Sequence, residues 1–144
     1  MFKKILYATD FSNESMAALE YIKQLRSAGA EEVIILNVVD RRGLSDLSRY
    51  ARKDLEGIQE DLEKKATAEM KPIEKDLKDH GFKVHLRVEK GGPFNEILRV
   101  AEEEDVSLIV TGSRGTGNFE ELFLGSVSYK VVRKVRKPVL VIKT

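Results

Sequence analysis

Hydrophobic positions along the chain fall into two patterns that alternate from one end to the other. Nearly continuous apolar runs occupy residues 5–9, 33–39, 106–111 and 138–142. All four runs predict strands, and those over 5–9, 33–39 and 106–111 are typical of strands buried on both faces of a parallel sheet. Residues 83–90 alternate instead, with Val84, Leu86 and Val88 apolar. This alternation predicts a strand with one exposed face, near an edge of the sheet.

Between these runs, apolar residues recur every three or four positions, which predicts helices. The predicted helices cover residues 15–27, 44–77, 93–104 and 126–135. The second is the longest and carries a single apolar stripe from Leu44 to Leu77. A straight helix of that length would span about 50 Å, which exceeds the diameter of a small domain. We therefore expect it to overhang the sheet or to break near Pro72, because proline disrupts a helix interior.

Strands and helices thus alternate strictly, beginning and ending with a strand. Strict alternation favours a parallel sheet with right-handed crossovers and helices on both faces. We predict a single doubly wound α/β domain over residues 1–144, with a five-stranded parallel sheet in the strand order 3-2-1-4-5. In this order the first strand is central, and the fourth strand is its neighbour across the point where the winding reverses.

Composition removes several classes of function. The chain has 25 Lys and Arg residues against 24 Asp and Glu residues, so its net charge of +1 does not point to nucleic acid or an anionic membrane. It contains no cysteine, which excludes disulfides and thiolate chemistry. The apolar run at the amino terminus is too short for a signal peptide, and no stretch is long enough to span a membrane. We therefore expect a cytoplasmic protein.

Two groups of titratable residues have ordinary interpretations. His80 and His85 do not form a ligand cluster, so we assign neither a metal nor a catalytic role. Basic residues gather on and after the last predicted helix: Lys130, Arg133, Lys134, Arg136 and Lys137. We interpret them as a solvated face that complements the helix C-terminus, because the near-neutral chain argues against a nucleic-acid patch.

Polar residues and glycines follow the strands where a ligand would bind. Open parallel sheets bind ligands beyond the carboxyl ends of their strands, at the reversal of winding. Asp10 follows the first strand and Gly112-Ser113 follows the fourth. The pair Gly125-Ser126 directly precedes a helix, where backbone N–H groups favour a phosphate. Glycines are also ordinary turn residues and serine is an ordinary N-cap, so this pattern alone leaves phosphate binding open.

Known nucleotide motifs do not fit, but one spacing does. Neither the P-loop pattern nor Gly-x-Gly-x-x-Gly occurs. Gly112, two residues, Gly115, nine residues and then Gly125-Ser126 match, without a gap, the signature of the ATP-binding subgroup of the universal stress protein family. The opening 4–12, the residues 125–128 and the closing 137–142 are similar to that family as well, so the resemblance covers essentially the whole chain.

The resemblance implies one universal stress protein domain over residues 1–144, of the Rossmann-like, adenine nucleotide alpha hydrolase-like fold, with ATP as ligand. It implies that Asp10 lies near the adenosine or a phosphate-bound Mg²⁺. The other implied contacts are Ala8, Thr9 and Val38 around the adenine, Gly112, Arg114 and Gly115 at the ribose and phosphates, and Gly125, Ser126, Val127 and Ser128 at the phosphates. Ala8 replaces a common proline and Asn37 a common histidine, which affects adenine fit rather than phosphate contacts.

We expect a nucleotide-dependent regulatory module of the stress response, with no assigned catalytic residue. A slow ATPase is an alternative, since fast hydrolysis needs a positioned base and a cation, and Arg114 is the only obvious cation in the loop. A nucleotide-independent dimeric assembly protein is a second alternative. The last strand is an unprotected apolar edge, and the resemblance implies a homodimer through it. The sequence identifies no other protein partner.

Overall fold

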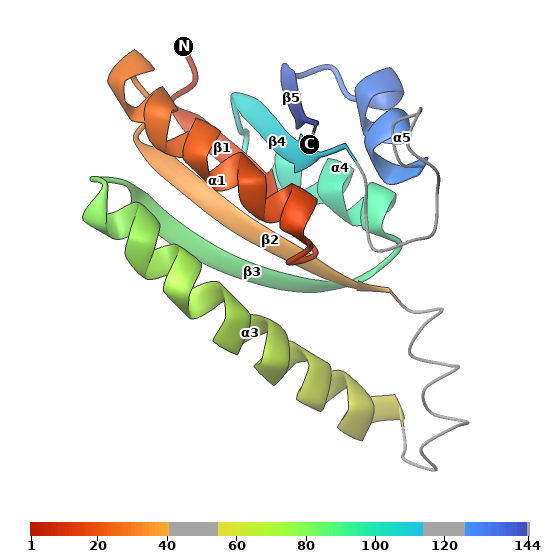
Figure 1. Cartoon of the computed structure of the whole chain (residues 1–144). Helices are drawn as coiled ribbons and strands as arrows, with labels where there is room; N and C mark the ends of the chain where they lie inside the picture. The colour runs from red at the N-terminus through yellow and green to blue at the C-terminus, as the bar shows by residue number, and fades with distance from the viewer. Residues whose placement is uncertain (41–54, 114–125, 144) are drawn as a thin grey trace.

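The computed structural model describes residues 1–40, 55–113 and 126–143, in which strands and helices alternate (Figure 1). The strands are β1 (Lys4–Ala8), β2 (Glu32–Asp40), β3 (Lys83–Gly91), β4 (Leu108–Gly112) and β5 (Val139–Ile142). The helices are α1 (Asn13–Leu25), α3 (Leu55–Asp79), α4 (Pro93–Glu103) and α5 (Ser126–Lys134), with a 3-10 turn, η1, over Arg26–Ala28. None of the helices described is long and apolar enough to cross a membrane.

The five strands form one parallel sheet in the order β3-β2-β1-β4-β5. Strand β1 is central, and Leu6 lies opposite Ile34 of β2 on one side and Ile109 of β4 on the other. The prediction of a doubly wound five-stranded sheet and of its strand order is therefore confirmed. The two edges are β3, as the alternation of its residues predicted, and β5.

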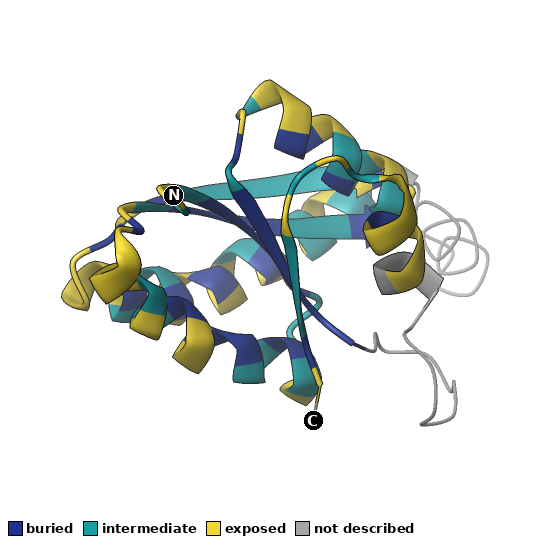
Figure 2. Ribbon diagram, turned by 90° about the horizontal axis from the view of Figure 1, so that it is seen from above, coloured by how far each residue is buried: buried dark blue, intermediate teal, exposed yellow. Residues whose placement is uncertain are grey.

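Helices cover both faces of the sheet. Ile22 of α1 and Met70 of α3 pack with Ile5 and Tyr7 of β1 in one cluster. On the opposite face, α4 and α5 pack against Leu6 and Ala8 and their neighbours. Alternate residues of the same strand thus enter two cores, which explains why the strand sequence is continuously apolar. Figure 2 shows the buried residues running along the central strands between the helices.

Helix α3 runs without interruption through Pro72, so the expected break at that residue is wrong. Pro72 is exposed, whereas Met70 and Ile73 on either side of it are buried against the sheet. Water can satisfy the carbonyl left without a donor on the exposed side, and packing of the buried side keeps the helix intact. The predicted residues 44–54 of this helix lie outside the described part of the chain.

Along its described length, α3 runs beside β2 and β3, which are each nine residues long. Near their carboxyl ends, Ile58 of α3 packs on Val39, with Leu62 and Val88 beside them. This small cluster adjoins the main core through Val88, which packs against both. The two long strands therefore form an arm that extends past β1, and the first half of α3 covers it.

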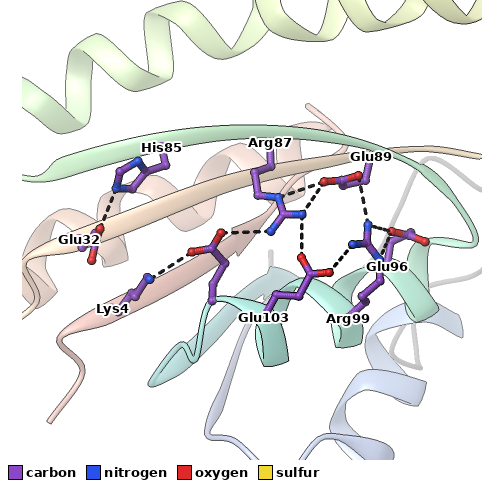
Figure 3. A network of polar contacts seen from close by, with 9 residues as sticks. Lys4, Glu32, His85, Arg87, Glu89, Glu96, Arg99 and Glu103 are labelled. Atoms are coloured by element: carbon purple, nitrogen blue, oxygen red, sulfur yellow. Dashed lines mark hydrogen bonds and ion pairs between the residues drawn. The ribbon is translucent and has the colours of Figure 1, made fainter.

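The face of β3 turned away from α3 carries a network of ion pairs (Figure 3). Arg87 contacts Glu89 at 2.7 Å, Glu103 at 3.0 Å and Glu104 at 3.1 Å. Lys4 lies 3.2 Å from Glu104. A second arginine, Arg99 of α4, joins the network through Glu89, Glu96 and Glu103. The network links β1, β3 and α4 on a face where no apolar side chain of β3 points.

These contacts lower the pKa of two carboxyl groups. The guanidinium groups of Arg87 and Arg99 lower the pKa of Glu103, and the ammonium group of Lys4, with Arg87 beyond it, lowers that of Glu104. A carboxyl group whose pKa is lower in the folded state stabilises the fold at pH values above its ordinary pKa. That stability is lost as the pH falls through the lowered folded value.

We predict that Arg87→Gln lowers the free energy of unfolding at neutral pH. We also predict that this free energy then depends less on pH in the acidic range. The gap in unfolding free energy between the variant and the parent protein narrows as the pH falls below about 4.5, where the unfolded-state carboxyl groups become protonated. Urea unfolding at a series of pH values measures this gap. Lys75→Gln, which removes an exposed pair with Asp79 on α3, is the control and leaves the acid dependence nearly unchanged. A gap that is constant with pH contradicts the prediction.

Candidate functional site

The carboxyl ends of β1, β2 and β4 meet at one edge of the sheet, as parallel strands require. Five of the predicted binding residues lie there and are described: Ala8, Thr9, Asp10, Val38 and Gly112. Residues Arg114, Gly115 and Gly125 lie outside the described residues. Ser126, Val127 and Ser128 form the first turn of α5.

Hydroxyl groups hold the turn that joins β1 to α1. The hydroxyl oxygens of Thr9 and Ser15 lie 2.8 Å apart, and both residues are buried. The Thr9 oxygen also accepts the N–H of Phe11 at 3.0 Å. Phe11 has a φ of 65°, a left-handed conformation that is uncommon for a bulky residue. The inward-pointing hydroxyl of Thr9 therefore stabilises a strained turn, which fixes the backbone next to the candidate site.

Asp10 caps this turn rather than the helix. Its Oδ1 accepts the N–H of Ser12 at 3.0 Å, whereas the hydroxyl of Ser12 accepts the N–H of Ser15 and is the N-cap of α1. Asp10 is therefore not the N-cap of α1, because the chain needs two more residues to turn from the strand into the helix. One oxygen of the Asp10 carboxylate is used by the turn, and within the described residues the other oxygen makes no hydrogen bond.

A hydrogen bond from the side chain of Tyr7 also stabilises the start of α1. Its hydroxyl donates to the carbonyl of Ser15 at 2.6 Å, and its ring is fully buried. Burial is the main cause that raises the pKa of Tyr7 to about 12. The phenol therefore stays protonated at physiological pH and acts as a structural donor, not as an acid or base.

Gly112 lies where β4 passes the first turn of α1. A Cβ atom at this position would be 3.1 Å from the backbone nitrogen of Ser15 and 3.2 Å from the carbonyl carbon of Glu14. Backbone atoms cannot move away at low cost, so packing alone requires glycine here. Ser113 follows, is buried, and donates its N–H to the carbonyl of Ile142 in β5 at 2.8 Å. The end of β4 is therefore held by both α1 and β5.

Asn37 is a polar residue of the site region to which sequence reasoning assigned no contact. Its side-chain amide donates to the carbonyl of Thr9 at 2.9 Å and so fastens the end of β2 to the end of β1. Its signal in the sequence was a lone amide in an otherwise apolar strand. Next to it, Val38 packs in the same hydrophobic cluster as Ala8, on the side of the sheet covered by α4. The structure thus brings together the two apolar residues implied at an adenine.

The backbone of Val38 faces the gap beyond the end of β1. The last backbone–backbone hydrogen bond at the ends of these two strands is the N–H of Thr9 donating to the carbonyl of Leu36 at 2.9 Å. Backbone groups point to the same edge at every second residue of a strand, so those of Val38 point in the direction of β1 as well. No residue of β1 pairs with Val38 in the described register. One N–H and one carbonyl are therefore directed into the candidate site.

The described residues contain no group of three or more His, Cys, Asp or Glu side chains that could hold a metal ion by themselves. Asp10 alone would leave most of the positions around a Mg²⁺ to other ligands, since that ion takes six. The donor set therefore fits a cation that a bound molecule largely coordinates, with Asp10 as one protein ligand. It does not fit a metal site made only of the described side chains.

Comparisons with known proteins agree on one family. A sequence model described as the universal stress protein family matches residues 1–143. Universal stress protein MJ0577 of Methanocaldococcus jannaschii is 41% identical, over 99% of this chain and 96% of the relative. A solved structure of MJ0577 superposes with a TM-score of 0.89, over 100% of this chain and 97% of the other.

Two further solved structures share the fold at low identity. One is a universal stress protein in complex with cAMP, 22% identical, with a TM-score of 0.67 and coverage of 99% and 97%. The other is the Arabidopsis thaliana family protein At3g01520 with AMP bound, 18% identical, with a TM-score of 0.65 and coverage of 98% and 91%.

We predict that Gly112→Ala lowers the free energy of unfolding by about 1–3 kcal/mol, because the added methyl group overpacks the contact with α1. Gly92→Ala is a matched control, since a Cβ there meets its nearest atom, Nδ2 of Asn95, at an ordinary 3.5 Å. Chemical denaturation of both variants measures the difference. If Gly112→Ala is no less stable than Gly92→Ala, the close approach of β4 and α1 does not require glycine.

Proposed function

Because the chain belongs to the universal stress protein family, we propose that it binds ATP at the carboxyl edge of β1, β2 and β4 and acts as a nucleotide-dependent regulatory module. The observation that carries this proposal is the direction of the Val38 backbone. Its N–H and carbonyl point beyond the end of β1, where apolar Ala8 and the turn at Asp10 also lie. An adenine ring needs such an apolar slot with a backbone donor and acceptor at its edge.

The phosphate end of the proposed site rests on the start of α5. This helix follows β4 along the chain and begins at Ser126, and the N-terminus of a helix presents free N–H groups and a partial positive charge. The family signature adds Arg114, Gly115 and Gly125 to this end. We assign phosphate contacts to these residues and to the first turn of α5, and ribose contacts to the region of Gly112.

A Mg²⁺ ion bound to the phosphates is part of the proposal. Asp10 would be its protein ligand, through the carboxylate oxygen that the β1–α1 turn does not use. The ion would neutralise phosphate charge, and Asp10 would orient it toward the strand ends. The bound AMP and cAMP of the two fold neighbours support an adenine nucleotide as the ligand class, although those proteins share only the fold with this chain.

We predict that isothermal titration with ATP and Mg²⁺ gives a dissociation constant in the micromolar range, which corresponds to a binding free energy on the order of −8 kcal/mol. Gly115→Val and Gly125→Val abolish the heat signal while circular dichroism stays native, because a branched Cβ fills the phosphate space. A protein free of nucleotide that gives no signal up to millimolar ATP rules out the proposal. If both variants bind like the parent protein, ATP binds elsewhere.

We also propose a homodimer formed through β5. The carbonyls of Pro138 and Ile142 accept from β4, so the backbone groups of the alternate residues Val139 and Val141 point to the free edge. The side chains of Val139, Leu140 and Val141 are partly exposed and none is charged. Such an edge is a template for pairing, and antiparallel pairing about a two-fold axis closes the assembly. The opposite edge, β3, carries charged residues that protect it.

For the dimer we predict that Val141→Pro gives a monomer, because it removes an outward donor and leaves the hydrogen bonds to β4 in place. Val141→Lys weakens the dimer without the constraint of a proline ring. Sedimentation at tens of micromolar protein distinguishes the species. A monomeric parent protein under these conditions ends the proposal of a β5 dimer and leaves the proposal of ATP binding untouched.

A further inference from the structure

The outer side of α5 exposes apolar and basic residues together. Tyr129 is 50% exposed and Val132 is 44% exposed, which is unusual among the large hydrophobic residues that the structure describes. Basic residues surround them. The α5 surface comprises Tyr129, Lys130, Val132, Arg133, Lys134 and Arg136, all of which are exposed. Figure 1 shows α5 on the outside of the molecule, next to α4.

The spacing places three of these residues on one helix face. Positions 129, 132 and 133 follow the steps of three and four that align side chains along a helix. The opposite face packs into the core through Val131, which is buried, and Val135. The α5 surface is therefore a true second face of the helix and not a continuation of the core.

Within the described residues, no carboxylate lies within 4.0 Å of Lys130, Arg133, Lys134 or Arg136, the four cations of the α5 surface. Arg87 alone contacts three carboxylates. Residues 126–144 carry six basic and no acidic side chains, so with a net charge of +1 for the whole chain the first 125 residues carry −5. Charge is thus segregated onto this end of the chain.

Helix electrostatics account for only part of this arrangement. Arg133 and Lys134 lie in the last turn, where a positive charge is favoured. Lys130 lies before that turn and Arg136 beyond the helix, and neither the exposed ring of Tyr129 nor Val132 gains from the dipole. We infer that the α5 surface docks a partner protein through an acidic segment with apolar side chains.

An acidic protein segment fits better than nucleic acid. The guanidinium of Arg133 lies 5.6 Å from the centroid of the Tyr129 ring and its Nη1 donates to the Tyr129 hydroxyl at 3.1 Å, so one face of the ring is not open to a base. The remaining chain, at −5, repels a long polyanion that extends past α5. Tyrosine and arginine around an aliphatic residue are typical of the centre of protein interfaces.

Fluorescence anisotropy tests the inference with a short labelled peptide in which leucine and phenylalanine recur every third or fourth position among glutamates. We expect saturable binding that weakens with salt. Lys130→Glu/Lys134→Glu weakens it at least about tenfold, and Tyr129→Ala/Val132→Ala about threefold to tenfold. Lys64→Glu/Lys65→Glu on α3 changes the net charge equally and is the control, with affinity kept within about twofold.

Several outcomes overturn the inference. One is absence of saturable binding, and another is equal binding of the same peptide with glutamine in place of glutamate. A third is a single-stranded oligonucleotide or an anionic vesicle that binds the α5 surface more tightly than the acidic peptide. A fourth is dissociation of an oligomer by Tyr129→Ala/Val132→Ala in sedimentation, which would make the surface an interface between copies of this chain. Circular dichroism of each variant verifies the fold, since all substituted residues are exposed.

Discussion

The fold depends on the burial of β1 on both of its faces. Ile5, Leu6 and Tyr7 have no exposed surface, and each face of the strand enters a different core. A strand in this position has no room for a polar ligand along its length, because an unpaired polar group there would be costly. Chemistry is therefore confined to the residues just past its end, where Thr9 and Asp10 lie beside β2 and β4.

Regular features of the fold could be predicted from the sequence because they depend on local periodicity. Continuous and alternating apolar runs distinguished the central strands from β3, though not from the second edge strand, β5. Strict alternation of elements predicted the parallel sheet. The break expected near Pro72 does not occur, because the burial of Met70 and Ile73 outweighs the missing backbone hydrogen bond. The N-cap of α1 could not be located from periodicity, because the length of the β1–α1 turn, which makes Ser12 the cap, has no periodic signal.

The position of the proposed site follows from topology, because the carboxyl ends of parallel strands meet at one end of the sheet. The contacts that shape the strand ends do not follow from topology. The packing reason for Gly112 was invisible, because it is a contact with Ser15, which lies almost a hundred positions away in the sequence. Likewise the bond from Asn37 to Thr9 joins two strands, and only the register of the sheet brings these residues together.

The arm formed by the ends of β2 and β3 carries a consequence for local unfolding. Its cluster has two buried residues, Val39 and Ile58, whereas the main core beneath β1 has many. A region with so little buried apolar surface opens at a lower free energy than the rest of the protein. Val38 belongs to this arm, so a molecule bound against its backbone would hold the arm closed and slow the exchange of its amide hydrogens with solvent. Binding at the site would then change the order in which parts of the sheet unfold locally.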